Sequence, residues 1–580
     1  MEKVISPSSQ SKSRERVRPP EVGLSRSKNY QAWSKEEFVR EIQKLEKRKK
    51  YGVVWEDKPE AVAELCKEKL PVLVEDKSRE VASSEDKPVN ILIEGDNYHA
   101  LSVLNYTHKG RVDVIYIDPP FNTGNQSWKY NNDYVEKDDQ WKHSKWLSFM
   151  DKRLRLAKRL LAPKGVLICA IDHNEQEGLG LLLQELLPNK EITCVTIVHN
   201  PRGIQGKNFA YCHEYAYFVY PPGDSIGRKQ RQEDEKEFMN LRNWGGASRR
   251  EDGKSLFYPI YFKKGKVVKI GEVPPDNLHP KKAYSESKDG LVEIWPIDNK
   301  GIERKWRYSR SSLAELTGDL RLVSVGGALQ VQLLKDEDRY KTVWIDTKYD
   351  ANAYGTQLVR QLIGKEFPFP KSLYTVKECL DAVALNNKSA LILDFFAGSG
   401  TTGHAVMEMN KADQGKRRFI LCTNNEGNIC TEICHPRIKK VMKQLTREAK
   451  GKPIQDPPGN LKYFKTDFVD AAPTDRNKKR LVDKSTEMLC LKEDCFDEVK
   501  RTQDYGIFNN NEGKHLGIVY DDDGIEPFKR EAKKLNRKLV VYVFSLDDSA
   551  REEEFKDVEK LVELKPIPAV ILSVYKRIFK

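Results

Sequence analysis

Short apolar runs that stop abruptly at polar, proline or glycine residues recur along most of the chain. The runs are Val89–Glu94, Val112–Ile117, 166–171, 192–198, 215–220, Leu391–Asp394 and Arg418–Thr423. Continuous runs of this length are typical of strands buried on both faces of a sheet. Residues 144–161 instead place Leu147, Met150, Leu154 and Ala157 at alternating steps of three and four, which predicts an amphipathic helix. The pattern as a whole predicts an α/β fold with a Rossmann-like sheet.

The run Val112–Ile117 breaks into Asp118, Pro119, Pro120 and Phe121. Two prolines cannot continue a central strand, so the chain leaves the sheet there, at the end of the strand where ligands bind in open α/β sheets. A carboxylate and a carbonyl held in a stiff turn can accept hydrogen bonds from both N–H groups of a planar exocyclic amine. Those bonds make the amine nitrogen more nucleophilic, and Phe121 can stack on a base. The alternative is a simple proline turn after a strand.

A second strand end carries a glycine-rich turn. The sequence L-I-L-D-F-F-A-G-S-G-T-T-G starts at Leu391, and a helix-like segment follows it. Glycines let the backbone approach a ligand closely. The turn matches neither G-x-G-x-x-G nor the phosphate-binding G-x-x-x-x-G-K-[ST], which argues against the two usual phosphate loops. The segment F-A-G-S-G instead resembles the S-adenosylmethionine loop of methyltransferases.

The order of these two motifs carries a family resemblance. D-P-P-F before F-A-G-S-G resembles the permuted, beta-class order of amino-directed DNA methyltransferases. Over roughly 41–469, the chain resembles most the adenine-specific modification (Mod) subunit of type III restriction-modification systems. RNA and glutamine methyltransferases with similar tetrapeptides usually place the glycine loop first. The resemblance implies a permuted methyltransferase sheet that binds S-adenosyl-L-methionine, with an inserted recognition domain.

The resemblance also implies site residues. Asp118, Pro119, Pro120 and Phe121 are the implied catalytic group. The implied cofactor-binding residues are Asp394, Phe396, Ala397, Gly398, Ser399, Gly400, Thr401, Phe367, Lys371 and Asp96, with Glu426 as the nearest acid for the cofactor ribose. Asp96 serves equally well as a helix N-cap. Lys371 stands in F-P-F-P-K-S, where Ser372 departs from the family's final proline.

Two loops are candidates for DNA contact. The loop 122–142 is rich in aromatic and basic residues, including Lys129, and suits a flipped base and nearby phosphates. In the second loop, 200–209, Arg202 and Lys207 can contact phosphate and Phe209 can stack on a base. The alternative for the first loop is that its aromatic side chains pack it over the core.

These observations divide the chain into seven predicted parts. They are 1–28 as a disordered basic tail, 29–88 as an N-terminal helical extension, 89–224 as the catalytic half of the methyltransferase domain, 225–353 as a target-recognition domain, 354–450 as the cofactor-binding half, 451–476 as a linker, and 477–580 as a small α/β module. In this last part the runs 516–520, 539–544 and 569–575 are predicted strands.

The composition predicts a polyanionic binding partner. The chain of 580 residues has 100 Lys and Arg against 87 Asp and Glu, a net charge of +13, which favours nucleic acid over a merely soluble charged surface. Without a long apolar stretch or an apolar N-terminal segment, we expect no membrane span, no secretory signal and a cytoplasmic location. The ten cysteines show no C-x-x-C spacing, so we expect reduced thiols and no metal site.

The predicted function is therefore a site-specific DNA methyltransferase acting on adenine N6 in duplex DNA. The expected partners are double-stranded DNA and a restriction (helicase-nuclease) subunit, with a homodimer left open. Cytosine-N4 methylation uses the same amine chemistry and is the first alternative. A solitary methyltransferase and a non-catalytic DNA-binding subunit are the others.

Overall fold

The computed structural model describes residues 33–579 except 47–54, 56–57, 83–87, 124, 131–132, 137–138, 206–207, 224–225, 231–235, 336, 448–458, 471, 473, 511 and 545–550. The chain divides into two units after Trp55. In the first unit, α1 (Lys35–Glu46) begins with the S-x-x-E capping box that its sequence predicts. The Ser34 amide donates to Glu37 Oε2 at 2.8 Å, and the Glu37 amide donates to Ser34 Oγ at 3.2 Å. The predicted tail 1–28 lies outside the described residues.

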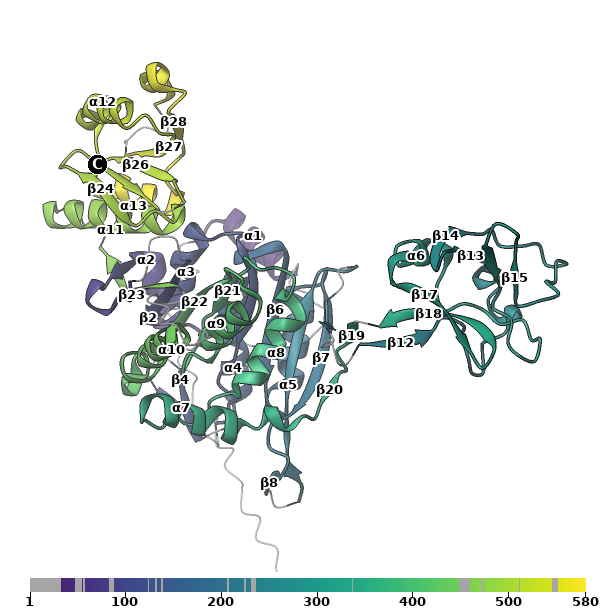
Figure 1. The fold of residues 1–580 in the computed structure, drawn as a ribbon. Coiled ribbons are helices and arrows are strands. Elements are labelled where there is room, and N and C mark those ends of the chain that lie inside the picture. The colour runs from purple at the N-terminus through teal and green to yellow at the C-terminus, as the bar shows by residue number, and fades with distance from the viewer. Residues whose placement is uncertain are drawn as a thin grey trace, which may run out of the picture. The chain divides into compact units, whose positions relative to one another are not determined.

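The second unit is built on one ten-stranded sheet with helices on both faces (Figure 1). Its strand order is β1 (Leu70–Glu75), β23 (Asn460–Val469), β2 (Val89–Glu94), β22 (Arg418–Thr423), β21 (Leu391–Asp394), β3 (Val112–Ile117), β6 (Leu161–Ile171), β10 (His213–Tyr220), β7 (Glu191–Val198) and β20 (Val343–Trp344). The strands from β23 to β6 are all parallel. This confirms the predicted α/β fold, and the strands β2, β3, β21 and β22 have the bounds read from the sequence.

Both faces of the sheet are covered, which explains the continuous apolar runs. Helices α8 (Leu373–Ala384), α9 (Thr401–Asp413) and α10 (His435–Arg447) share one apolar core with strand residues such as Val114, Tyr116 and Ile392. The next residues along β3, Ile115 and Ile117, are buried as well and point to the opposite face. Helices α3 (Asn97–Thr107) and α4 (Lys142–Leu160) pack against each other, and α4 contacts α5 (Gln176–Leu186).

The insertion has its own core. Three strands, β12 (Glu237–Asn240), β18 (Ala328–Lys335) and β17 (Leu320–Val325), form one sheet. A second sheet contains β14 (Lys266–Ile270), β13 (Ile260–Lys263), β16 (Leu291–Ile294) and β15 (Tyr284–Glu286). Both sheets, with the short α6 (Arg310–Ala314), pack around Tyr258, Phe262 and Trp306. The strands β11 (Arg228–Gln230) and β19 (Glu337–Arg339) pair where the chain enters and leaves the insertion.

The end of the insertion lies earlier than the predicted boundary at 353. Strand β20 pairs with β7 of the main sheet, and Trp344 and Tyr349 belong to the core of that sheet rather than to the core of the insertion. Helix α7 (Gln357–Ile363) then leads toward α8. Residues 343–353 therefore belong with the main sheet rather than with the insertion.

Two predicted segments outside the main runs are wrong in part. The proposed linker 451–476 contains β23, which lies between β1 and β2 inside the sheet. The proline- and glycine-rich residues before it suggested a linker, but N-L-K-Y-F-K-T-D-F-V supplies a complete strand. The extension 29–88 is not purely helical, because after α2 (Ala61–Glu68) the run L-P-V-L-V-E forms β1 and pairs antiparallel with β23.

The C-terminal module is α/β as predicted, with one element misassigned. Its sheet order is β24 (Asp497–Arg501), β25 (Tyr505–Asn509), β26 (His515–Val519), β27 (Leu539–Val543) and β28 (Val562–Leu564). Its helices are α11 (Asp475–Glu493), α12 (Ile525–Leu535) and α13 (Ala569–Phe579). The run 569–575, predicted as a strand, lies in α13 and packs on α11. A short apolar run does not by itself distinguish a buried strand from a buried helix.

No helix within the described part of the chain is long and apolar enough to cross a membrane.

Candidate active site

The two predicted motifs lie side by side. Strand β3 runs parallel to β21, with Val114 opposite Ile392 and Ile115 opposite Leu393. Asp118, which follows β3, and Asp394, the last residue of β21, therefore lie at the same edge of the sheet in neighbouring positions. They are 276 positions apart in the sequence (394 − 118). Since ligands bind outside the carboxyl ends of such strands, this edge is the candidate active site.

The D-P-P-F turn is held from both sides. The Trp146 indole on α4 donates a hydrogen bond of 2.7 Å to the Pro120 carbonyl. Asn122, the first residue after the turn, is fully buried at a φ of 55°. Its side-chain amide donates to Glu175 Oε1 at 2.5 Å and to the Lys142 carbonyl at 3.1 Å. These contacts fix the turn, as expected for a group that must present one carboxylate in one place. Sequence reasoning did not single out Trp146, Asn122 or Glu175.

Asp118 has an unused acceptor in a charged setting. Its side chain is a quarter exposed, but its Oδ1 atom is buried and accepts no hydrogen bond from the described residues. Burial raises the pKa of Asp118 to about 6, the nearby Lys371 ammonium opposes this rise, and Glu214 adds to it. A buried acceptor without a partner is costly unless a ligand supplies the donor. The geometry therefore suits an incoming N–H group.

Lys371 lies at the D-P-P-F turn. The resemblance implied a cofactor contact, but the structure places its ammonium 3.3 Å from Asp118 Oδ1 and 4.3 Å from the centre of the Phe121 ring. The same ammonium donates a hydrogen bond of 2.5 Å to Glu214 Oε2 on β10. The next residue, Ser372, caps α8 by accepting from the Tyr374 amide at 3.3 Å, so the serine at the family's proline position has a local role.

The glycine loop is organised by Asp394. Its Oδ1 accepts from the Phe396 amide at 2.9 Å, and its Oδ2 accepts from the Thr402 hydroxyl at 2.5 Å. Burial raises the pKa of this carboxyl to about 7, and the two hydrogen bonds oppose the rise. Gly398 and Gly400 adopt φ values of +48° and +80°, in the left-handed region that favours glycine. Asp394 thus shapes the loop, because both of its oxygens are already bonded within it.

A buried arginine supports the same loop from below. Arg437 on α10 is fully buried and donates to Ser399 Oγ and Thr401 Oγ1, both at 2.9 Å. Burial lowers its pKa to about 10. Among the described residues no carboxylate pairs with it, and its remaining neighbour is the buried His404 ring at 3.4 Å. The hydroxyls of Ser399 and Thr401 therefore face the protein, and of the two loop glycines Gly398 is half-buried and Gly400 is buried. No motif in the sequence pointed to Arg437.

The shape and chemistry of the loop fit S-adenosylmethionine. The rings of Phe367 and Phe396 are half-buried beside it. A Cβ added to Gly398 would lie 3.4 Å from the Phe367 ring, so a side chain there would enter the space beside that ring. Half-buried aromatic rings next to a side-chain-free backbone offer a stacking surface for a flat adenine.

Helix α3 joins the loop to the rest of the edge. Asp96 caps this helix by accepting from the Tyr98 and His99 amides at 2.7 and 3.3 Å, which is the structural role that the sequence allowed. Asn97 donates to the Phe395 carbonyl at 3.0 Å. The buried Arg153 donates to Asn97 Oδ1 at 2.5 Å and to Glu60 Oε2 at 2.9 Å. A cofactor contact by Asp96 stays a prediction.

The candidate DNA-contact residues are less tightly placed. Arg202 and Phe209 lie on the hairpin of β8 (Ile204–Gln205) and β9 (Ala210–Tyr211), where Phe209 is 81% exposed. The hairpin reaches the ligand edge, because Tyr211 stacks on His173, which follows β6, at 3.8 Å. Phe369, which sequence reasoning did not single out, is 91% exposed at a φ of 53°, two residues before Lys371.

The predicted roles of three further residues stay predictions. Glu426 is exposed in a short 3-10 turn after β22, and its ribose role stays a prediction. Lys129 falls in the hairpin of β4 (Asn125–Tyr130) and β5 (Asp133–Glu136), so the predicted loop has a regular core. Lys207 lies outside the described residues.

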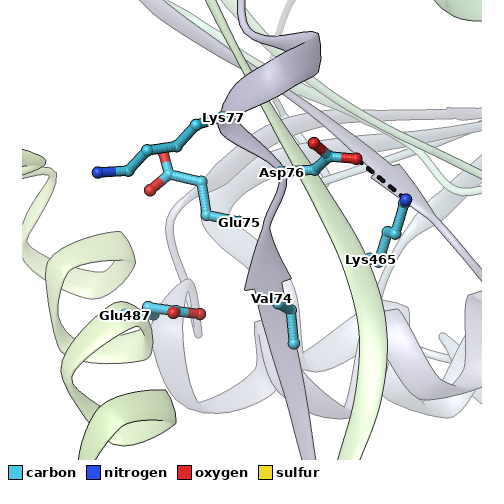
Figure 2. Close-up of a pocket in the computed structure, with 6 residues that line it drawn as sticks. All are labelled: Val74, Glu75, Asp76, Lys77, Lys465 and Glu487. Carbon is cyan, nitrogen blue, oxygen red and sulfur yellow. Dashed lines mark ion pairs between the residues drawn. The ribbon is translucent and has the colours of Figure 1, made fainter.

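A separate cavity of about 370 Å³ lies where β1, β23 and α11 meet (Figure 2). It is lined by Val74, Glu75, Asp76, Lys77, Lys465 and Glu487. Lys465 pairs with Asp76 at 3.0 Å, as the dashed line in Figure 2 marks. None of the motif residues lines this cavity, so it is not part of the candidate active site.

Comparison with known proteins agrees with this geometry. A family model described as DNA methylase matches residues 112–433, which include both motifs and the insertion between them. The type II methyltransferase M.KpnI of Klebsiella pneumoniae is 31% identical over 59% of this chain and 82% of its own length. The EcoPI Mod subunit of a type III restriction-modification enzyme, from Escherichia phage P1, is 27% identical over 65% of each chain.

The matches to Mod subunits span less than two thirds of the length of each. Among solved structures, a DNA modification methylase from Thermus thermophilus in complex with S-adenosyl-L-methionine is 13% identical. That match covers 64% of this chain and 97% of the other, with a TM-score of 0.29.

Proposed function

This chain belongs to the DNA methylase family of S-adenosylmethionine-dependent enzymes, and on that premise we propose that it methylates the N6 amine of adenine in duplex DNA. The observation that carries the proposal is the buried Asp118 Oδ1, which accepts no hydrogen bond from the described residues, beside a glycine loop that fits the cofactor. Type III Mod subunits and type II methyltransferases among the relatives support the same conclusion. Cytosine N4 offers a similar exocyclic amine, so the product decides between the two.

The residues of the D-P-P-F turn would act on the amine. Asp118 accepts a hydrogen bond from the amine, which shifts electron density onto the nitrogen and stabilises the positive charge that develops there. Phe121 provides a face for the base, and the contacts of Trp146 and Asn122 keep these groups in place. When bound at the glycine loop, S-adenosylmethionine supplies an electrophilic methyl group. Holding the amine in line with that methyl group lowers the barrier to methyl transfer through proximity and orientation.

A base inside a duplex cannot reach this edge, so the target adenine must leave the stack. The exposed ring of Phe209 on the β8–β9 hairpin would contact displaced bases. The insertion would read the flanking sequence. It exposes Trp244, which lies 4.6 Å below the Arg242 guanidinium and 5.5 Å from that of Arg304. Arginine and aromatic side chains together suit base edges, stacked bases and phosphates.

A restriction subunit is the proposed protein partner, on the strength of the Mod relatives. The C-terminal module, with its own core around Phe528 and Phe555, is the candidate docking region. The test is co-purification of this chain with the product of a neighbouring helicase-nuclease reading frame, followed by mass measurement of the complex. A chain that stays alone or pairs only with itself would favour a solitary methyltransferase or a homodimer.

The experiment that tests the function is transfer of a labelled methyl group from S-adenosylmethionine to unmethylated bacterial DNA. The DNA is then digested to nucleosides and analysed by mass spectrometry, with Asp118→Ala as the inactive control. Label in N6-methyladenosine is the expected result. Label in N4-methylcytosine would keep the chemistry and replace the substrate. Label on RNA alone, or none on DNA while the cofactor binds, would overturn the proposal.

A further inference from the structure

The buried ion pair next to Asp118 is not explained by cofactor binding or by DNA contact. Lys371 lies in the segment before α8 and is 8% exposed, and Glu214 lies on β10 and is 4% exposed. Burying both groups costs solvation free energy, which their mutual attraction and their hydrogen bonds must offset. They come from elements 157 positions apart (371 − 214) and meet beside the carboxylate of the D-P-P-F turn.

The distances show an unequal sharing of the lysine. The ammonium donates a hydrogen bond of 2.5 Å to Glu214, whereas it contacts Asp118 as an ion pair at 3.3 Å. Asp118 Oδ1 therefore feels a positive charge and still has its acceptor position open. If Glu214 were absent, the ammonium could turn to Asp118 and occupy the oxygen that the amine needs. If Lys371 were absent, Asp118 would face a second buried carboxylate.

From this arrangement we propose that the Lys371–Glu214 pair is a positioning device that keeps Asp118 ionised while leaving its inner oxygen open for the target amine. The inference deepens the proposed function and rests on it. Neither residue needs to touch the base or the methyl group. Lys371 acts through its charge on Asp118, and Glu214 acts by holding the ammonium of Lys371 away from direct donation to Asp118.

The other ionisable groups around the three residues do not replace the pair. Asp172, after β6, and Asp394, at the end of β21, are carboxylates and disfavour a second negative charge at Asp118. Tyr116 on β3 is buried, and burial raises its pKa well above the usual value. The His199 ring, after β7, has its pKa lowered by burial, so it is neutral near pH 7. Among the described residues, Lys371 is thus the cation that faces Asp118, and burial lowers its pKa less than Asp118 and Glu214 raise it.

The test uses two substitutions that act in opposite directions. Lys371→Met removes the positive charge. The acid limb of the pH profile of the single-turnover methylation rate is therefore expected to move up by about one pH unit or more. Glu214→Gln removes a negative charge and releases the ammonium toward Asp118, so the limb is expected to move down and the plateau rate is expected to fall. Lys371→Arg restores the charge and should return the limb toward the wild-type position.

A second readout does not depend on turnover. The protonation of the Asp118 carboxyl is followed by infrared spectroscopy, as the difference between each variant and the same variant carrying Asp118→Asn. The midpoints are expected to move in the same two directions. The double variant Lys371→Met/Glu214→Gln leaves no unpaired buried charge, so it should fold even where Lys371→Met does not, with a midpoint between those of the single variants. The S-adenosylmethionine affinity of each variant is expected to stay within about threefold of wild type.

The outcomes distinguish the positioning role of the Lys371–Glu214 pair from the proposed function. Midpoints that do not move, or that move in the same direction in both single variants, would overturn the positioning role even if the wild type methylates adenine. A tenfold or larger loss of S-adenosylmethionine affinity in Lys371→Met, with the Asp118 midpoint unchanged, would instead make Lys371 a cofactor ligand. Opposite shifts of the carboxyl in a wild type that methylates no DNA would support the pair and overturn the proposed function.

Discussion

Asp118, just after β3, and Asp394, the last residue of β21, lie at the ends of neighbouring parallel strands, yet their surroundings give them different roles. Burial raises the pKa of both, to about 6 and about 7. Asp394 uses both oxygens within its own loop, whereas Asp118 keeps one buried oxygen without a hydrogen bond. An aspartate at the end of a buried strand is thus a scaffold in one position and a candidate reacting group in the next.

The difference lies in what each turn supplies. The glycine loop offers a backbone N–H and the Thr402 hydroxyl, which satisfy Asp394 from within. The two prolines after Asp118 have no N–H groups to donate, so that carboxylate cannot be satisfied by the turn that follows it. A proline-rich turn therefore leaves an acceptor for a ligand, and a glycine-rich turn closes around its own acid and presents its backbone.

The largest expected effect is on Asp118. Asp118→Ala removes the acceptor for the amine, and turnover is expected to fall about a hundred- to a thousandfold, since one preorganised polar group contributes on that scale. Cofactor affinity should remain near wild type. Single-turnover methylation and calorimetry of S-adenosylmethionine binding measure the two quantities. Turnover within tenfold of wild type would contradict the assigned role.

For Asp394, the main expected effect is on cofactor affinity. Asp394→Ala leaves the Phe396 amide and the Thr402 hydroxyl without their acceptor, so the loop loses its shape. Two lost hydrogen bonds to a buried acid correspond to about 1–3 kcal/mol, or about ten- to a hundredfold in cofactor affinity. Thr402→Val removes one of the two bonds and serves as the graded control. If Asp394→Ala bound the cofactor normally, the carboxylate would not organise the loop.

The two glycines of the loop separate strain from ligand access. Gly400→Ala places a Cβ 3.0 Å from Cys434 Sγ at a φ of +80°, and it should destabilise the fold by about 1–2 kcal/mol. Gly398→Asp puts a charged side chain on the open side of the loop and should mainly weaken cofactor binding. Gly110→Ala, at a φ of +69° with no neighbour within 4 Å, calibrates the backbone strain alone. Thermal unfolding and calorimetry together distinguish the three.

The pH dependence of stability provides a finer comparison. Because the folded pKa of Asp394, about 7, lies above its ordinary value of 3.8, the neutral carboxyl stabilises the fold. That contribution is fully present below about pH 4 and is lost as the pH rises to about 7. Asp394→Asn should therefore show a flatter urea midpoint between pH 4 and 7 than wild type. An identical slope in both proteins would exclude a raised pKa.

The smallest expected effects are at the exposed rings. Phe209→Ala and Phe369→Ala should each raise the KM for DNA about three- to tenfold and leave cofactor affinity unchanged, if each ring stacks on a base. Val268→Ala, at a residue that is 54% exposed on the insertion, is a matched apolar control. Fluorescence of a 2-aminopurine placed at the target position would report base displacement directly. Unchanged KM values would assign these rings no part in DNA contact.

The sequence located elements well where a long-range partner was not needed to recognise them. Strands β2, β3, β21 and β22 have the predicted bounds because each is a continuous apolar run that two layers of helices cover. The predictions failed where an apolar run can form either a strand or a helix, or where a neighbouring element decides which of them forms. The run at Ala569 forms α13 because α11 offers it a face to pack on, and β1 exists because β23 lies beside it.

By itself, the sequence determined the fold class, the two motifs and their permuted order, because strands, proline turns and glycine loops depend on a few adjacent residues. Only the tertiary structure decided what surrounds each motif. Lys371 and Glu214 meet at Asp118, and Arg437 lies beneath the glycine loop, although no spacing in the sequence relates them. The physical reason is that charge, burial and hydrogen-bond satisfaction depend on every group within a few ångströms, and the sheet brings those groups together from distant parts of the chain.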